Sequence, residues 1–360
     1  MSRISNKNNE LVEMLKLTAP GTALREGLDN VLRAKTGGLI VMADTPEIMA
    51  LVAGGFNLDC SYSPAQLYEL AKMDGAIILN KDGSKIMVAN AHLNPDQMVA
   101  SSETGIRHRT AERVARQTGE LVLCISQRRN IITLYKGDIK YYLKDTGSIL
   151  EMANQAIQTL DRYKTVLDKA YNNLSVLEYD GMVSLADVTR VLQRAEMVNL
   201  VEDELEKYVS ELGTEGRLVK MQVEELINNV AADELRTIMD YENWNGEKTA
   251  EEVLQRLHTL DSDELLNLDN IAKELGYDSL KNNSDTILLT KGYRLLSRVP
   301  RLPFGVIQNM VRFFHDFTAV QQASIAELDE VEGIGETRAK NIRDGLKRMR
   351  EQIYSDYNWI

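Results

Sequence analysis

The chain has 360 residues, of which 44% are hydrophobic and 27% charged, an ordinary composition for a soluble protein with two or three domains. It contains no apolar signal region and no run of 18 apolar residues, which argues against secreted and membrane-spanning classes, so we expect a cytoplasmic protein without a membrane partner. Its two cysteines, Cys60 and Cys124, match no zinc spacing and are expected in the core.

The formal net charge of −12 is unevenly distributed along the chain. Residues 1–147 have a net charge of +2, residues 148–290 a net charge of −16, and residues 291–360 a net charge of +2. Phosphate binding needs cations, so the acidic middle cannot be the part that meets nucleic acid. Any polyanionic partner must be met at the two ends.

The first 147 residues alternate helical and strand patterns. Helical spacing covers residues 9–16 and 21–34, with Thr22 as a plausible N-cap, and a further helix follows the Ser63-Pro64 start signal. Buried or paired strands are expected at residues 39–43, 77–79, 85–91, 121–125, 130–135 and 138–143. This order predicts one α/β domain with a mixed sheet.

The densest anion-binding chemistry lies at residues 103–110, where Arg107, His108 and Arg109 are adjacent. Residues 111–116 have helix-forming composition, so we expect the cluster where a loop runs into a helix N-terminus, a position that favours anions. Taken alone, the tripeptide is more readily interpreted as a solvated basic face, and it is the neighbouring segments that favour a phosphate site.

Two turns add to this chemistry. Asp74-Gly75-Ala76 precedes a strand and is either a turn with a capping aspartate or a carboxylate for a divalent ion beside a glycine that admits a ligand. Residues 126–130, which include Arg128 and Arg129, are either a charged turn or a further phosphate or base contact.

Together these segments closely resemble the diadenylate cyclase domain of the DisA family, the bacterial DNA integrity scanning proteins. The resemblance implies condensation of two ATP molecules into cyclic di-AMP and two pyrophosphates with Mg²⁺ or Mn²⁺. Each domain holds one ATP, so a two-fold product requires two facing domains, and the resemblance implies a homo-oligomer, an octamer in the family.

The resemblance also implies roles for particular residues. The catalytic residues are Asp74, Arg107, His108 and Arg109, and Asp74 is also the metal ligand. The nucleotide-binding residues are Gly75, Ala76, Leu93, Thr104, Gly105, Ile106, Thr110, Ser126, Arg128 and Arg129.

Ile106 departs from the family pattern, which usually has threonine immediately before Arg-His-Arg. If that hydroxyl binds phosphate, its loss costs about 1.5–3 kcal/mol, or roughly ten- to a hundred-fold in activity. If it serves packing, little changes. The departure motivates an alternative, a DNA-binding scaffold whose nucleotide domain binds ATP with little or no turnover.

The acidic middle of the chain reads as helical. From Ile149, apolar positions alternate steps of four and three, which predicts a long helix packed against partners. Further helical patterns cover residues 185–192, 202–212, 219–230 and 250–257. Asp261-Ser262-Asp263 could suggest a metal pair, but an ordinary helix start is the favoured interpretation.

The last segment carries an independent signal. Residues 325–342 read as helix, Gly-Ile-Gly hairpin and helix, and look like a helix-hairpin-helix DNA-binding motif rather than a plain capped turn. Residues 299–305, followed by a helix to Phe314, resemble the degenerate first hairpin of a tandem pair. The expected DNA-binding residues are Gly333, Ile334, Gly335, Thr337, Arg338 and Lys340.

We therefore predict three domains: residues 1–147 for diadenylate cyclase catalysis, 148–290 as an acidic helical spine, and 291–360 for DNA binding. Backbone phosphate contacts do not read bases, so the expected partner is branched or damaged DNA, bound by shape at the nucleoid, with an effect on synthesis. A polymerase or nuclease is disfavoured because paired catalytic carboxylates are missing.

Overall fold

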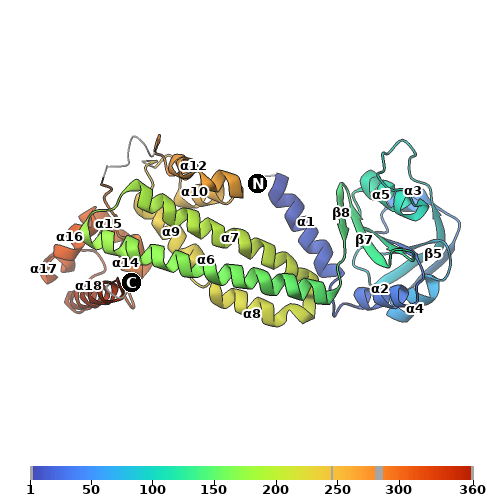
Figure 1. Ribbon diagram of the computed structural model, residues 1–360, viewed down its shortest axis with the longest axis horizontal. Coiled ribbons are helices and arrows are strands. Elements are labelled where there is room, and N and C mark those ends of the chain that lie inside the picture. Colours follow the sequence, from blue (N-terminus) through green and yellow to red (C-terminus); the bar gives the residue numbers. More distant parts are fainter. Residues whose placement is uncertain (1–2, 245, 280–286, 358–360) are drawn as a thin grey trace. The chain divides into compact units, whose positions relative to one another are not determined.

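The computed structural model describes residues 3–244, 246–279 and 287–357 (Figure 1). The chain divides into two compact units. The first comprises Met1–Gln155 and Leu205–Met221, and the second comprises Ala156–Glu204 and Gln222–Ile360. The predicted functional division at residues 147 and 290 stays a prediction, because compactness alone does not assign activities.

An eight-stranded mixed sheet forms the centre of the first unit in the part of the chain that the structure describes. Its strand order is β2-β5-β4-β1-β6-β7-β8, with β3 paired to β5; β1 and β4 are parallel, and the other pairs are antiparallel. The strands are β1 (Gly38–Met42), β2 (Val52–Ala53), β3 (Phe56–Ser61), β4 (Ala76–Leu79), β5 (Lys85–Leu93), β6 (Val122–Ser126), β7 (Ile131–Lys136) and β8 (Ile139–Tyr142). The α/β fold with a mixed sheet is confirmed.

Helices cover both faces of this sheet. Alternate residues of a strand point to opposite faces, so Ile40 and Met42 of β1 meet α1, α2 and α4, whereas Leu39 and Val41 meet α3 and α5. These helices are α1 (Arg3–Leu17), α2 (Ala23–Arg33), α3 (Pro46–Leu51), α4 (Pro64–Leu70) and α5 (Ile106–Thr118). Thr22 and Ser63 cap α2 and α4 as predicted.

Cys124 is fully buried and Cys60 partly buried against the core, as predicted for both cysteines. Helix α3 and strands β2 and β3 were not predicted. Strand β3 (FNLDCS) does alternate apolar and polar residues, the pattern of a half-buried strand, although most of its side chains are exposed.

Helices make up the rest of the described chain. They are α6 (Thr146–Asp180), α7 (Leu185–Leu212), the 3₁₀ helix η1 (Gly213–Gly216), α8 (Arg217–Leu226), α9 (Val230–Tyr241), α10 (Ala250–Leu257), α11 (Ser262–Leu266), α12 (Leu268–Glu274), α14 (Tyr293–Ser297), α15 (Phe304–Phe314), α16 (Phe317–Gln322), α17 (Ile325–Asp329) and α18 (Glu336–Tyr357). Among the described residues, none of the helices combines the length and apolar character needed to cross a membrane.

The helical predictions hold with two corrections. The patterns at 185–192 and 202–212 belong to one continuous helix, α7. The pattern at 219–230 is interrupted between α8 and α9, where Asn229 has a left-handed backbone with φ of 68°. Asp261 begins α11 with a capping box to Glu264, which supports the interpretation of that segment as a helix start.

Two hairpins near the C-terminus repeat the same geometry. Helices α14 and α15 begin at residues 293 and 304, and α17 and α18 begin 32 residues later, at 325 and 336. The corner of each hairpin has positive φ, 62° at Arg301 and 88° at Gly333. Both hairpins pack in one core of the second unit with Val176 and Tyr179 of α6.

Candidate active site

Sheet register brings four of the strand ends to one edge. Ile40 of β1 lies beside Ile77 of the parallel β4, so Gly37 and Gly75 both precede these strands at the same edge. Antiparallel pairing of Ala76 with Ala91 brings the end of β5, with Leu93, to this edge as well. Gly38 pairs with Ile125, which places Ser126, the last residue of β6, there too. Asp74 precedes Gly75 at this same edge.

The N-terminus of α5 carries the Arg-His-Arg cluster. Helix α5 begins at Ile106, and its N-cap residue Gly105 is extended and provides no side-chain cap. The first N–H groups therefore have no capping partner from Gly105, and the helix dipole adds positive potential. The predicted loop-to-helix junction is confirmed, and it is a suitable place for a phosphate.

Arg107 reaches Asp74 across the sheet edge and forms an ion pair with it. The Asp74 side chain is 92% exposed, so its carboxylate remains accessible to a ligand. A Cβ added to Gly37 would lie 2.1 Å from Nη1 of Arg107, and one added to Gly75 would lie 2.4 Å from the backbone carbon of Asn90. Both glycines are therefore required for this arrangement.

His108 lies in a hydrogen-bonded chain. Its Nδ1 is 3.0 Å from the hydroxyl of Tyr135, which donates to Oε1 of Glu103 at 2.8 Å, and Lys140 pairs with the same oxygen at 2.5 Å. Burial lowers the pKa of His108; Glu103 opposes this, and the positive charges of Arg129, Lys140 and Arg107 lower it further. Burial alone would raise the pKa of Glu103, but the hydrogen bonds from Lys140 and Tyr135 hold it below its ordinary value.

Arg109 is directed toward the preceding loop. Its guanidinium donates to the carbonyl oxygens of Glu103 at 3.4 Å and Thr104 at 3.2 Å. Buried Glu112 holds the same loop by accepting hydrogen bonds from Ser101 Oγ at 2.5 Å and Ser102 N at 2.8 Å. The loop that precedes α5 is thus fixed by side chains of α5 itself.

The turn after β6 contains the remaining predicted cations. Ser126 Oγ accepts a hydrogen bond from the backbone N–H of Arg129 at 3.2 Å, and both Arg128 and Arg129 are exposed. The charge of Arg129 acts on His108, so this turn lies close to the cluster.

The other predicted nucleotide-binding residues differ in how far they are buried and in which element they lie. Ala76 is buried at the start of β4, Leu93 pairs with Val52, and Thr110 is half-buried on α5. Ile106 is 83% exposed, so position 106 packs little within the chain. This exposure disfavours packing as the reason for a threonine at that position.

Three residues of the site were missed from the sequence: Gly37, Tyr135 and Lys140. Each acts on a residue far away in the chain, and no local pattern marks them. Strand pairing could have found Tyr135, because its strand β7 pairs with β6 across the turn at residues 126–130 and packs on the face that carries α5.

No group of three or more His, Cys, Asp and Glu side chains that could hold a metal ion occurs among the described residues. Asp74 nevertheless supplies one accessible carboxylate, and Mg²⁺ commonly takes one or two carboxylates together with substrate phosphates. The donor set therefore fits a metal shared with a bound nucleotide.

The predicted DNA-binding residues lie together in the turn between α17 and α18 and at the start of α18. Gly333, Gly335, Thr337 and Lys340 are exposed, whereas Ile334 is 7% exposed and anchors the hairpin in the core. Arg338 donates to the carbonyl of Gly333. Lys340 pairs with Glu336 at 2.6 Å.

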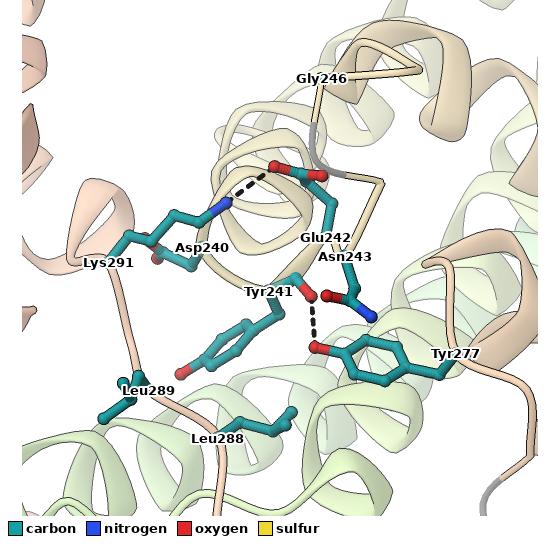
Figure 2. A pocket seen from close by; sticks show the side chains of 9 residues that line it. All are labelled: Asp240, Tyr241, Glu242, Asn243, Gly246, Tyr277, Leu288, Leu289 and Lys291. Atoms are coloured by element: carbon teal, nitrogen blue, oxygen red, sulfur yellow. Dashed lines mark hydrogen bonds and ion pairs between the residues drawn. The ribbon is translucent and has the colours of Figure 1, made fainter. Parts of the chain in front are cut away.

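A cavity of about 430 Å³ lies elsewhere, in the second unit (Figure 2). Its lining includes Lys291, paired with Glu242 at 2.7 Å, and Tyr277, whose hydroxyl donates to the carbonyl of Tyr241 at 2.9 Å. None of the predicted site residues lines it. The cation in this cavity already has an anionic partner, so the cavity does not resemble a phosphate site.

Comparison with known proteins agrees with this geometry. The model of the DisA bacterial checkpoint controller nucleotide-binding region matches residues 25–139, and that of the DisA linker region matches residues 143–284. Curated relatives named DNA integrity scanning protein DisA include those of Carboxydothermus hydrogenoformans (55% identical over 96% of this chain and 98% of the relative), Acetivibrio thermocellus (53% over 97% of each) and Clostridium tetani (52% over 98% of each).

An α/β domain that matches a nucleotide-binding family model, with cationic side chains at a helix start beside its sheet edge, defines a nucleotide-binding protein. The identity of 52–55% to these relatives, over almost the whole length of the chain, then shows the family. The chain belongs to the DisA family, and it is a diadenylate cyclase, a nucleotidyltransferase that takes ATP as its substrate.

Proposed function

We propose that this cyclase condenses two ATP molecules into cyclic di-AMP at the sheet edge formed by Asp74, Gly75, Ser126 and the first turn of α5. The convergence of these segments supports the proposal. In each half-reaction a 3′-hydroxyl loses its proton to solvent, its oxygen forms a bond to the α-phosphorus of the other ATP, and the bond from that phosphorus to pyrophosphate breaks. Two such steps close the ring and release two pyrophosphates.

The residues of this edge suit the charges of that reaction. Arg107, Arg109 and the unpaired N–H groups of α5 bind and orient phosphate oxygens, where charge develops in the transition state. The exposed carboxylate of Asp74 suits it to orient the attacking hydroxyl and, with the phosphates, to hold Mg²⁺ or Mn²⁺. The metal supplies charge neutralisation on the phosphates.

A two-fold product requires two such edges to face each other. We therefore propose that the active form is a homo-oligomer, and an octamer by family resemblance. The alternative of a scaffold without turnover is not favoured, because the chain shares more than half of its residues with DisA relatives over nearly its whole length.

We further propose that residues 291–360 bind branched or damaged DNA without reading sequence, and that the protein acts at the nucleoid. The repeated hairpins support this, because exposed Gly333 and Gly335 leave backbone N–H groups of the second hairpin open to phosphate at the N-terminus of α18. Arg338 and Lys340 add cations nearby, consistent with a helix-hairpin-helix motif.

The deciding experiment is incubation of the purified chain with ATP and Mn²⁺ or Mg²⁺, followed by mass spectrometry for cyclic di-AMP. We expect product, and at least a hundredfold loss for Asp74→Asn, about the contribution of a positioned catalytic group. Asp59→Asn is the matched control, because Asp59 is an exposed carboxylate on β3 that pairs with Lys85. Full activity of Asp74→Asn would refute the assigned site.

DNA binding has its own test. The double variant Gly333→Glu with Gly335→Glu should weaken binding to a four-way junction while leaving basal synthesis intact, since it places two carboxylates where phosphates are expected. Gln322→Glu with Gln352→Glu adds the same charge at exposed positions outside the hairpin and controls for net charge. Unchanged junction affinity of the glycine variant would contradict the hairpin assignment.

A further inference from the structure

The hydrogen-bonded chain around His108 fixes where its protons lie. Glu103 accepts from both Lys140 and Tyr135 and is 7% exposed, and its lowered pKa keeps it ionised. A carboxylate only accepts hydrogen bonds. The single hydroxyl proton of Tyr135 is therefore committed to Glu103.

This commitment determines the tautomer of His108. Because Tyr135 donates its only hydroxyl proton to Glu103, its oxygen can only accept a hydrogen bond from His108. The Nδ1 of His108 is 3.0 Å from that oxygen, so Nδ1 carries a hydrogen. Burial and the surrounding cations lower the pKa of the ring and keep it neutral near pH 7. A neutral imidazole protonated on Nδ1 has a lone pair on Nε2.

Nε2 is the unexplained atom of this cluster. It is buried and finds no hydrogen-bond partner among the residues that the structure describes. Buried polar atoms are nearly always paired, so this acceptor calls for a donor that comes from outside the described chain. A phosphate oxygen cannot serve, because it is itself an acceptor. An O–H group can.

We propose that Tyr135, Glu103 and Lys140 are positioning residues of the cyclase, which hold His108 as a neutral acceptor of a hydroxyl hydrogen bond at Nε2. His108 then differs in role from Arg107 and Arg109, to which the proposed function assigns the binding of phosphate as cations. The proposal rests on the proposed placement of ATP at this edge. The hydroxyl comes either from the ribose of the nucleotide or from an ordered water.

The tautomer can be measured directly, because the chain has only four histidines. In ¹⁵N-histidine-labelled full-length protein, solid-state NMR should show His108 protonated at Nδ1 and unprotonated at Nε2, with His108→Gln used for assignment. In Tyr135→Phe the proton should no longer be confined to Nδ1. An imidazolium, or a proton on Nε2, in the wild-type protein at neutral pH would overturn the proposal.

Nucleotide analogues separate the two hydroxyl sources. If the ribose donates, a non-reacting ATP analogue should shift the Nε2 resonance, and the same analogue without the 3′-hydroxyl should not. If water donates, neither analogue changes the resonance of the unprotonated Nε2. Both results support an acceptor, whereas protonation of Nε2 on nucleotide binding would contradict it.

Kinetics tests the positioning role. Tyr135→Phe should lower kcat by about tenfold or more, the scale of a misplaced acid–base group, with KM for ATP changed by less than about twofold. Glu103→Gln should have a similar effect, and the double variant should be no worse than either single one because both act through His108. Additive losses would overturn the shared role.

Tyr141→Phe is the matched control. Tyr141 also donates from a tyrosine to a glutamate, Glu211, at 2.6 Å, but does not contact His108. It should leave kcat and the His108 resonances unchanged. The NMR result does not depend on turnover, so absence of cyclic di-AMP from the wild-type protein would count against the proposed function and leave the tautomer test intact.

Discussion

Gly37 contributes space to the candidate site rather than a functional group. A Cβ at this position would lie 2.1 Å from Nη1 and 3.1 Å from Cζ of Arg107. These two nearest atoms are the end of a flexible side chain, and the next, the carbonyl oxygen of Ile125, is 3.3 Å away, so the fold can adapt with a small backbone shift while the guanidinium moves. The position of Arg107 beside Asp74 thus depends on a residue 70 positions earlier.

We expect Gly37→Ala to lower kcat/KM by about tenfold or more, because a displaced arginine loses a charge-assisted contact of about 1.5–3 kcal/mol. Its melting temperature should stay close to that of the wild type. Gly38→Ala is the control, since a Cβ there makes only ordinary contacts, the nearest at 3.5 Å to Ile40. Equal activity losses in the two variants would argue against displacement of Arg107.

Much of the site was visible from local patterns. The position of Arg107, His108 and Arg109 at a helix start follows from the helical composition after them, and Asp74-Gly75 from the strand that follows. The partners of these residues were not visible. Tyr135 is 27 positions from His108, and only the folded register of β7 against the face that carries α5 brings them together.

At the level of elements, α7 and α9 bring two buried carboxylates together. Glu196 is hydrogen-bonded to His258 at 3.0 Å, and Glu234 accepts from Asn199 at 2.9 Å. Burial first, and then the negative charge of Glu196, raise the pKa of Glu234 well above its ordinary 4.5. The sequence placed both glutamates in helical patterns but could not indicate that they face each other.

A raised folded-state pKa makes the stability of these helices depend on pH. The contribution of protonated Glu234 is fully present below pH 4.5 and is lost as the pH rises through the raised value. Glu234→Gln keeps a neutral side chain at every pH. Its melting temperature should therefore exceed that of the wild type at pH 8, by about 2 °C or more.

The same comparison at pH 5 should show a much smaller difference, because the wild-type carboxyl is then protonated as well. His258 and Tyr171 also face this pair, so Glu251→Gln, an exposed change on α10, serves as the control for the general effect of removing a charge. A stabilisation by Glu234→Gln that is equal at pH 5 and pH 8 would show that the carboxyl does not titrate as inferred.

The hairpins also show what sequence patterns can and cannot predict. The Gly-Ile-Gly sequence marked the second hairpin, and the structure gives the reason for its first glycine: Gly333 has a φ of 88°, which suits glycine. The first hairpin has the same backbone with Arg301 at the corner, at φ of 62°. Its prolines and arginine hide the repeat, which became certain only through the 32-residue offset of the helices.

At the scale of the whole molecule, charge separates the two proposed activities. The net charge of −16 between residues 148 and 290 disfavours DNA there, so nucleotide and DNA are expected at opposite ends of the sequence. If DNA changes synthesis by changing ATP binding, the coupling must be reciprocal. Thermodynamic linkage requires that each ligand alter the affinity for the other by the same factor.

We therefore expect a four-way junction to change the Kd of a non-reacting ATP analogue, by about fivefold or more, and the analogue to change the Kd of the junction equally and in the same direction. Isothermal titration in each order measures both factors. The Gly333→Glu, Gly335→Glu variant should lose both effects while keeping its affinity for the analogue. Linear DNA of the same length should change the Kd of the analogue less if shape is sensed.

A junction that changes kcat while both Kd values stay constant would place DNA control on the chemical step or on the alignment of facing sites, because linkage constrains binding free energies and not turnover.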